Sequence, residues 1–192
     1  MRNGVISYQK ASGLAMFSGI VIFCFYSFIR LKEMLPVEEY GYDAIFFILL
    51  ILCFAWGGDT CAYFAGRAFG KHKLCPVVSP KKTVEGAIGG VLGTMVFGVL
   101  VTVIYSIAAD RMEEFTRSNI GVSMYVIIAL LACVAAVLGI YGDLFASVVK
   151  RQCGIKDYGT IFPGHGGILD RFDSVMFIAP FVTMVVIAAF YN

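Results

Sequence analysis

Charged residues are scarce in this sequence. Its 192 residues include only 15 Lys and Arg and 13 Asp and Glu, whereas 59% are hydrophobic and the mean hydropathy is +0.84. Soluble domains usually contain about 25% charged and roughly 45–50% apolar residues. This composition excludes a soluble globular enzyme and a disordered chain. The net charge of +2 is also too small for a surface that binds nucleic acid.

Several common motifs are missing as well. The six cysteines form no C-x-x-C pair, which excludes the usual zinc and thioredoxin-like spacings. The sequence contains neither G-x-x-x-x-G-K-[ST] nor G-x-G-x-x-G, so the usual phosphate-binding loops are absent. We assign the cysteines no role, because a free Cys in an apolar helix usually behaves as a small hydrophobic residue.

Charge-free runs predict membrane helices, each of which needs about 20 mostly apolar residues. Four such runs cover residues 11–29, 86–109, 120–142 and 174–192. A fifth run, 44–58, is interrupted by Asp59, but apolar sequence resumes as far as residue 66. We therefore predict a helix over about 44–66 with a carboxylate inside it. The fold class is an all-α polytopic transmembrane bundle of about five spans, forming a single domain over 1–192, with its first span retained rather than cleaved.

Lys and Arg residues predict the orientation of this bundle. The N-terminal tail and the second and fourth loops together carry 11 of them, whereas the first and third loops carry 4. Because cytoplasmic loops are enriched in Lys and Arg, we expect the N-terminus and the second and fourth loops to be cytoplasmic, and the C-terminus to lie outside.

Local signals predict features of two helices. Ser79-Pro80 is typical of an N-cap followed by proline at the first helical position. Pro180 is expected to kink the last span. Small residues spaced four apart allow helices to pack closely in lipid, and we interpret four glycines in this way: Gly86, Gly89, Gly90 and Gly93.

The first of two polar segments runs from residue 59 to 85. Asp59 lies in apolar sequence, where an ionisable group is costly and is therefore a functional candidate. Cytoplasmic location alone explains the number of Lys and Arg residues in this segment. It does not explain Asp59 or the polar cluster that ends the segment: Ser79, Lys81, Lys82, Thr83 and Glu85.

The second polar segment runs from residue 143 to 173. Asp143, Ser147 and Lys150, followed by Arg151, have the spacing of one helix face. Lys156 and Asp157 come next, then a glycine-rich bend at 163–167, and finally Asp170, Arg171 and Asp173. Carboxylates suit Mg²⁺, and Lys and Arg neutralise phosphate oxygens. The segment therefore predicts phosphoryl or nucleotidyl transfer between a lipid and a soluble substrate.

The pattern from Ser147 to Asp173, S-x-x-K-R-x-x-x-x-K-D-x-x-x-x-x-P-G-H-G-G-x-x-D-R-x-D, resembles the signature of the phosphatidate cytidylyltransferases (CDP-diacylglycerol synthases). Asp59, the stretch 65–72 and the cluster 79–86 are also similar to that family. The similarity covers about residues 44–190. Family members usually have more chain and more spans before this region, so the N-terminal part is expected to be naturally short or truncated.

The resemblance implies transfer of CMP from CTP to phosphatidate, with Mg²⁺ as cofactor and K⁺ as a candidate companion ion. It implies that Asp143 and Asp170 hold the metal, with Asp59 a further candidate, and that Asp143, Lys150 and Asp170 are catalytic. His165 is a candidate for proton transfer, for a phosphate contact or for fixing the bend. The substrate-binding candidates are Ser79, Lys81, Lys82, Thr83, Glu85, Ser147, Arg151, Lys156, Asp157, His165, Arg171 and Asp173.

The family resemblance also implies a multi-pass protein of the bacterial inner membrane, with a cytoplasmic active site, that forms homodimers and binds no nucleic acid. Three alternatives remain open. The chain could act on another membrane lipid phosphate such as an ether lipid, it could be an inactive subunit that binds a partner or lipid headgroup, or it could be a small transporter or channel.

Overall fold

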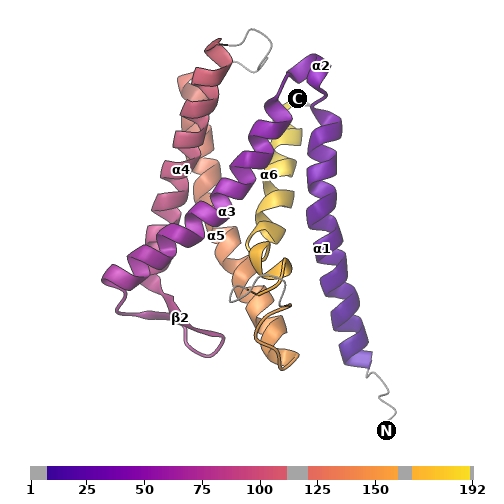
Figure 1. Cartoon of the computed structure of the whole chain (residues 1–192), viewed down its shortest axis with the longest axis vertical. Coiled ribbons are helices and arrows are strands. Elements are labelled where there is room, and N and C mark those ends of the chain that lie inside the picture. Colours follow the sequence, from indigo (N-terminus) through magenta and orange to yellow (C-terminus); the bar gives the residue numbers. More distant parts are fainter. Residues whose placement is uncertain (1–7, 112–120, 160–165, 191–192) are drawn as a thin grey trace.

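The computed structural model describes residues 8–111, 121–159 and 166–190 and is almost entirely helical (Figure 1). In chain order its elements are α1 (Tyr8–Met34), α2 (Val37–Tyr40), α3 (Asp43–Phe69), β1 (Lys73–Cys75), β2 (Ser79–Thr83), α4 (Val84–Arg111), α5 (Val122–Gln152), the 3-10 helix η1 (Leu169–Arg171) and α6 (Val175–Phe190).

Four helices, α1, α3, α4 and α5, are long and apolar enough to cross a membrane. The fifth predicted span corresponds to α6, which is apolar and largely buried but has only 16 residues. At about 1.5 Å per residue, a helix of this length is shorter than a hydrocarbon core of about 30 Å. The all-α polytopic prediction is confirmed. Asp59 lies inside α3, as the interrupted apolar run predicted.

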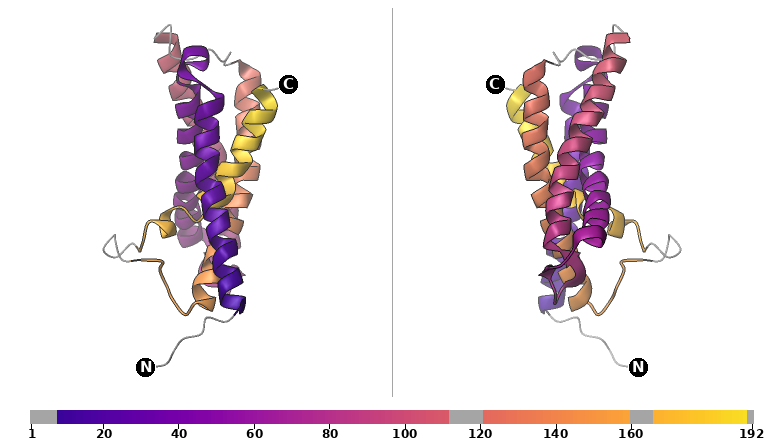
Figure 2. Two further views of the ribbon diagram at one scale, coloured as in Figure 1. Left: turned by 90° about the vertical axis from the view of Figure 1, so that its right-hand side faces the viewer. Right: turned by 90° about the vertical axis from the view of Figure 1, so that its left-hand side faces the viewer.

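The long helices lie side by side along the long axis of the molecule, and α3 crosses the bundle obliquely (Figures 1 and 2). The hairpin of β1 and β2 lies at the same end as the beginning of α1 and the segment between α5 and α6. The short helix α2 and the end of α6 lie at the opposite end. The two basic polar segments therefore share one end of the bundle, as the distribution of Lys and Arg predicted.

Small residues form the contact between α3 and α4. A Cβ atom added to Gly86 would lie 2.8 Å from the backbone oxygen of Ala62, and one added to Gly90 would lie 3.0 Å from the Ala62 Cβ. Gly93 similarly faces Cys61. The predicted packing role of these glycines is confirmed, because a larger side chain at any of them would force the helices apart.

Helix α6 is held in the bundle through α1. The Thr183 hydroxyl donates a hydrogen bond to the Ser27 backbone oxygen at 3.3 Å, and both residues are buried. Leu31, one turn after Ser27, and Val182, next to Thr183, are also buried. In an apolar bundle such internal polar contacts between helices satisfy groups that lipid cannot. They fix α6, and with it the segment just before α6, against α1.

The sequence-based prediction of a helix start at Ser79-Pro80 is wrong. Residues Ser79–Thr83 form β2, which pairs with β1 in an antiparallel hairpin, and α4 begins only at Val84. The Thr83 hydroxyl accepts a hydrogen bond from the Gly86 backbone N–H at 3.1 Å, the interaction expected of an N-cap. The helix start is therefore set by Thr83, which leaves Lys81 and Lys82 on a strand.

Candidate active site

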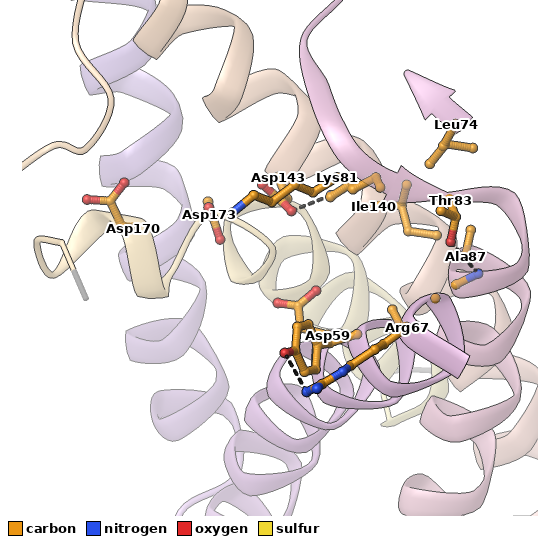
Figure 3. Close-up of a pocket in the computed structure, with 15 residues that line it drawn as sticks. Asp59, Arg67, Leu74, Lys81, Thr83, Ala87, Ile140, Asp143, Asp170 and Asp173 are labelled. Atoms are coloured by element: carbon orange, nitrogen blue, oxygen red, sulfur yellow. Dashed lines mark hydrogen bonds and ion pairs between the residues drawn. The ribbon is translucent and has the colours of Figure 1, made fainter. Parts of the chain in front are cut away.

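The two polar segments meet in a pocket of about 450 Å³ at the hairpin end of the bundle (Figure 3). Helix α3 contributes Asp59, and α5 contributes Asp143. Strand β2 contributes Lys81, Lys82 and Thr83, and the segment around η1 contributes Asp170 and Asp173. The pocket thus brings four carboxylates together with several cations, although these groups come from four separate parts of the chain.

An ion pair joins the hairpin to α5 across this pocket. The Lys82 ammonium contacts the Asp143 carboxylate, and both side chains are about a quarter exposed. The Ser147 hydroxyl, one helical turn after Asp143, donates a hydrogen bond to the same carboxylate at 3.3 Å. The predicted helix face of α5 is confirmed for Asp143 and Ser147, and Lys82 of the first polar segment contacts Asp143 of the second.

A second cation, Lys150, lies between two carboxylates. Its Nζ is 2.9 Å from Asp170 Oδ1 and 3.9 Å from Asp173 Oδ2, and all three side chains are largely buried. Lys150 therefore contacts both carboxylates. Such buried charges are stable only when paired. Lys150 therefore fixes the segment around η1 against the end of α5.

The two carboxylates around Lys150 have different proton affinities. Burial opposes ionisation of Asp170, but the Gly167 backbone N–H, Lys150 and the Tyr158 N–H hold the pKa of its carboxyl below the ordinary value. At Asp173, burial and the nearby Asp143 charge raise the pKa to about 7, and Lys150 opposes that increase. Asp170 is therefore ionised at neutral pH, whereas Asp173 can carry a proton.

Asp59 is hydrogen-bonded to a residue that comes much later in the chain. Its Oδ2 accepts a hydrogen bond from the Ser174 hydroxyl at 3.0 Å, and Ser174 is buried immediately before α6. A second link from α3 to this segment runs from the Trp56 indole N–H to the Arg171 backbone oxygen at 3.0 Å. These contacts hold α3 against the segment around η1 and direct Asp59 into the pocket.

Tyr158 contacts the cluster formed by Lys150, Asp170 and Asp173, called here the Lys150 cluster. Its backbone N–H donates to Asp170 Oδ2 at 2.7 Å, and its hydroxyl donates to the Ala146 backbone oxygen at 3.0 Å. The Lys150 Nζ lies 5.3 Å from the centre of the Tyr158 ring, within the range of a cation–π contact. The ring also stacks on Phe17 of α1 at 5.3 Å, so α1 contributes to the support of this site.

Other predicted residues lie outside the pocket lining. Glu85 closes the base of the hairpin, where it accepts hydrogen bonds from the Lys71 and His72 backbone N–H groups and contacts the His72 ring at 2.7 Å. Ser79 pairs with Cys75 in the hairpin. Arg171 contributes its backbone oxygen to the Trp56 contact. Arg151, Lys156 and Asp157 are exposed near the end of α5. His165, with the first part of its glycine-rich bend, lies outside the described residues.

Sequence reasoning alone did not assign four residues that contribute to this site. Arg67 and Tyr63 line the pocket from the last turns of α3, while Tyr158 and Ser174 hold Lys150 and Asp59. Arg67 lies within a stretch that was noted for its family resemblance. Ser174 follows Asp173 directly. Neither Tyr63 nor Tyr158 had a spacing that distinguished it from the many other aromatic residues of the chain.

The oxygen donors of the pocket fit a hard cation. Asp143 and Asp170, predicted to hold a metal, both line the pocket, and each is paired with a lysine. Figure 3 shows Asp173 between them in that view. Among the described residues, no group of three or more Asp, Glu, His or Cys side chains forms a ready-made metal site. Mg²⁺ commonly binds one or two carboxylates and completes its shell with water and substrate phosphates, so this donor set suits Mg²⁺.

The bundle and its pocket define an integral membrane protein with a charged, phosphate-compatible site at one end. A family model described as the cytidylyltransferase family matches residues 4–189. The chain therefore belongs to the cytidylyltransferase family. This match includes α1, which lies before the region near residue 44 where the motif resemblance begins.

Curated relatives support the same assignment. The chain is 36% identical over 159 residues to a phosphatidate cytidylyltransferase of Bacillus subtilis, an alignment that covers 83% of this chain and 52% of the relative. It is 42% identical over 145 residues to a phosphatidate cytidylyltransferase of Staphylococcus epidermidis, covering 76% of this chain and 50% of the relative. The chain spans about half the length of the curated relatives it matches.

Proposed function

We propose that this chain transfers CMP from CTP to phosphatidate, forming CDP-diacylglycerol and pyrophosphate. The observation that carries this proposal is the convergence of Lys82, Asp143 and the Lys150 cluster on one pocket at the end of a membrane bundle. The names of the curated relatives supply the reaction and the substrates. The pocket contributes the phosphate-binding cations and the carboxylates that such a transfer uses.

The reaction is an in-line substitution at the α-phosphorus of CTP. A phosphate oxygen of phosphatidate forms the new P–O bond, the bond between the α-phosphorus and its bridging oxygen breaks, and pyrophosphate leaves with that electron pair. A phosphate monoester is already largely ionised at neutral pH, since its second pKa is about 6. The protein therefore needs no general base. Its main task is to align two polyanions.

Lysines in and beside the pocket would align the two polyanionic substrates. Lys81 and Lys82 lie on strand β2 and would bind the triphosphate, and Lys150 would neutralise charge that grows on the departing pyrophosphate. Mg²⁺, with K⁺ as a candidate companion, would be held by Asp143 and Asp170, with Asp59 a further candidate ligand, and would offset phosphate charge. Binding of CTP with its metal would require Lys82 and Lys150 to exchange their carboxylate partners for phosphate oxygens.

We further propose that the pocket faces the cytoplasm of a bacterial inner membrane. Support comes from the excess of Lys and Arg at the hairpin end of the bundle and from the bacterial sources of the relatives. Because CTP is a soluble substrate, its pocket must open to the compartment that contains it. The homodimer is likewise proposed from the family resemblance, and chemical crosslinking of the purified protein tests it.

The proposed activity is tested with purified, membrane-reconstituted chain and CTP labelled at the α-phosphate. We expect label to appear in lipid when phosphatidate is present, and to be lost in Asp143→Asn and Asp170→Asn. Asp110→Asn is a matched control, because Asp110 is exposed at the other end of α4. Labelling of an ether-lipid phosphate instead of phosphatidate would change the substrate. Absence of labelling with either lipid would overturn the proposed activity.

A further inference from the structure

The cations in and beside the pocket fall into two groups. Lys82 is paired with a carboxylate in the pocket, and Lys150 has the same kind of pairing beside it. Arg67 and Lys81 also line the pocket, but within the described residues neither has a carboxylate at ion-pairing distance. An unpaired cation in a pocket is available to an incoming anion without first releasing a protein partner.

Unlike Lys81, which lies on a strand, Arg67 lies on a candidate membrane span. It belongs to the last turn of α3, one of the candidate membrane spans, and α3 ends two residues later. Its neighbours Tyr63 and Phe64 are 60% and 62% exposed. Aromatic residues near the end of a span are typical of the headgroup region, and an arginine there extends its charge to that same layer.

The Arg67 guanidinium is also directed by a partner. Its Nη1 donates a hydrogen bond to the Tyr63 hydroxyl at 3.5 Å. In the view of Figure 3, Arg67 lies on one side of Asp59, whereas Lys81 and Asp143 lie on the other. The two unpaired cations therefore approach the pocket from different elements, Lys81 from the hairpin and Arg67 from the membrane helix.

We propose that Arg67 binds the phosphate of the lipid substrate and that the Tyr63 hydroxyl orients its guanidinium, while Lys81 serves the nucleotide. This inference rests on the proposed cytidylyl transfer. A phosphomonoester on a diacylglycerol stays at the depth of the headgroups, the layer in which the end of a membrane helix such as α3 is expected. A planar guanidinium can donate two parallel hydrogen bonds to one phosphate, which an ammonium group cannot.

A simpler role for Arg67 must be separated from this one. Arginine at the C-terminal end of a membrane helix is favoured by the helix dipole and by anionic headgroups, whatever its neighbours. Arg111 provides the matched control, because it occupies the last turn of α4, is exposed and does not line the pocket. A general role in the interface would make Arg67 and Arg111 equivalent. A phosphate-binding role would make them different.

The experiment measures initial rates of the reconstituted chain, with phosphatidate varied at saturating CTP and then CTP varied at saturating phosphatidate. For Arg67→Ala we expect the KM for phosphatidate to rise roughly 10- to 100-fold, the range for a lost hydrogen bond to a charged group. The KM for CTP should change less than about twofold on the same energy scale. Arg67→Lys should be intermediate, and Arg111→Ala should match the wild type. A rise confined to the KM for CTP, or equal effects at Arg67 and Arg111, would overturn the proposal.

A binding measurement keeps this test separate from the test of activity. Chain in nanodiscs of phosphatidylcholine with a small fraction of phosphatidate is analysed for retained lipid by native mass spectrometry. We expect the wild type and Arg111→Ala to retain phosphatidate selectively and Arg67→Ala to lose that selectivity. If the wild type makes no CDP-diacylglycerol but this difference is found, the proposed activity fails and the Arg67 assignment stands. Equal retention by all three proteins overturns the assignment.

Discussion

Lys82 on β2 forms an ion pair with Asp143 on α5, and this contact connects the two polar segments of the chain. It also links the hairpin, which is anchored between α3 and α4, to a helix that follows both. The pair is partly exposed, so water and substrate can reach it. A cation in this position can bind a phosphate once its carboxylate partner accepts another positive charge.

Replacing Lys82 by Gln removes this cation while keeping a side chain of similar length. We expect CTP-dependent labelling of lipid to fall by at least about 100-fold, the scale typical of losing one group that stabilises transition-state charge. Lys73→Gln is the control, since Lys73 is exposed in the same hairpin and does not line the pocket. Labelling rates are compared in purified proteins with matching thermal unfolding. Equal rates for the two variants would contradict a catalytic role for Lys82.

Tyr158 is expected to act through its ring more than through its hydroxyl. In Tyr158→Phe the ring below Lys150 remains and only the bond to Ala146 is lost. In Tyr158→Leu the cation–π contact is also lost, and we expect kcat to fall roughly threefold to thirtyfold relative to the Phe variant. Steady-state kinetics of the two proteins provide the measurement. If Phe and Leu impair kcat equally, the hydroxyl or general packing explains the effect and the ring does not position Lys150.

The hydrogen bond from Ser174 to Asp59 should contribute to stability. We expect Ser174→Ala to lower the free energy of unfolding by about 1 kcal/mol, since it leaves Asp59 without this donor. Thr60→Ala is the comparison, because the exposed Thr60 hydroxyl bonds only to the Trp56 backbone oxygen within its own helix. Denaturant unfolding in detergent, followed by circular dichroism, gives both values. A smaller loss in Ser174→Ala than in Thr60→Ala would contradict the importance of this link.

The close contact of α3 and α4 makes Gly86 intolerant of side chains. Because a Cβ atom there already approaches the Ala62 backbone oxygen, we expect Gly86→Val to cost about 1–3 kcal/mol, as other overpacked sites do. Gly19→Val in α1 should be much milder, since nothing lies within 4 Å of the position a Cβ would occupy there. Thermal unfolding of both variants is measured in the same detergent. Similar losses of stability in the two variants would contradict the close contact between α3 and α4.

The bundle itself was predictable because hydropathy and charge act over whole helices. Four charge-free runs and the run around Asp59 all became helices, and the two basic segments were correctly placed at one end of the bundle. The shortness of α6 was not foreseen. Its charge-free run covers 174–192, whereas the described helix covers Val175–Phe190, and residues 191–192 lie outside the described part of the chain.

The hairpin could not be predicted from local sequence. Ser79-Pro80 has the chemistry of a helix start, and strands of three and five residues show too little alternation to compete with that signal. The Glu85 carboxylate also accepts hydrogen bonds from the Lys71 and His72 backbone N–H groups, contacts across 14 and 13 positions that local spacing does not reveal.

The sequence indicated the charged residues of the site but not the residues that hold them in position. Spacing indicated Asp143, Lys150, Asp170 and Asp173, because ionisable residues are conspicuous in apolar sequence. Tyr158 and Ser174 were missed because their roles come from tertiary contacts with Lys150 and Asp59. Some residues match the signature but are exposed and do not line the pocket. They are Arg151, Lys156 and Asp157.

The link between Ser174 and Asp59 also has a consequence for biosynthesis. During translation, α3 and the hairpin are made first, so Asp59 and the lysines of β2 exist before Asp143, Asp170 and Ser174 have been added. Domains form as the chain is synthesised from its N-terminus, but this pocket has walls from both halves. A nascent chain that stops before α6 therefore lacks the contact that fixes Asp59. The complete pocket can therefore form only after the segment around η1 and α6 has been added.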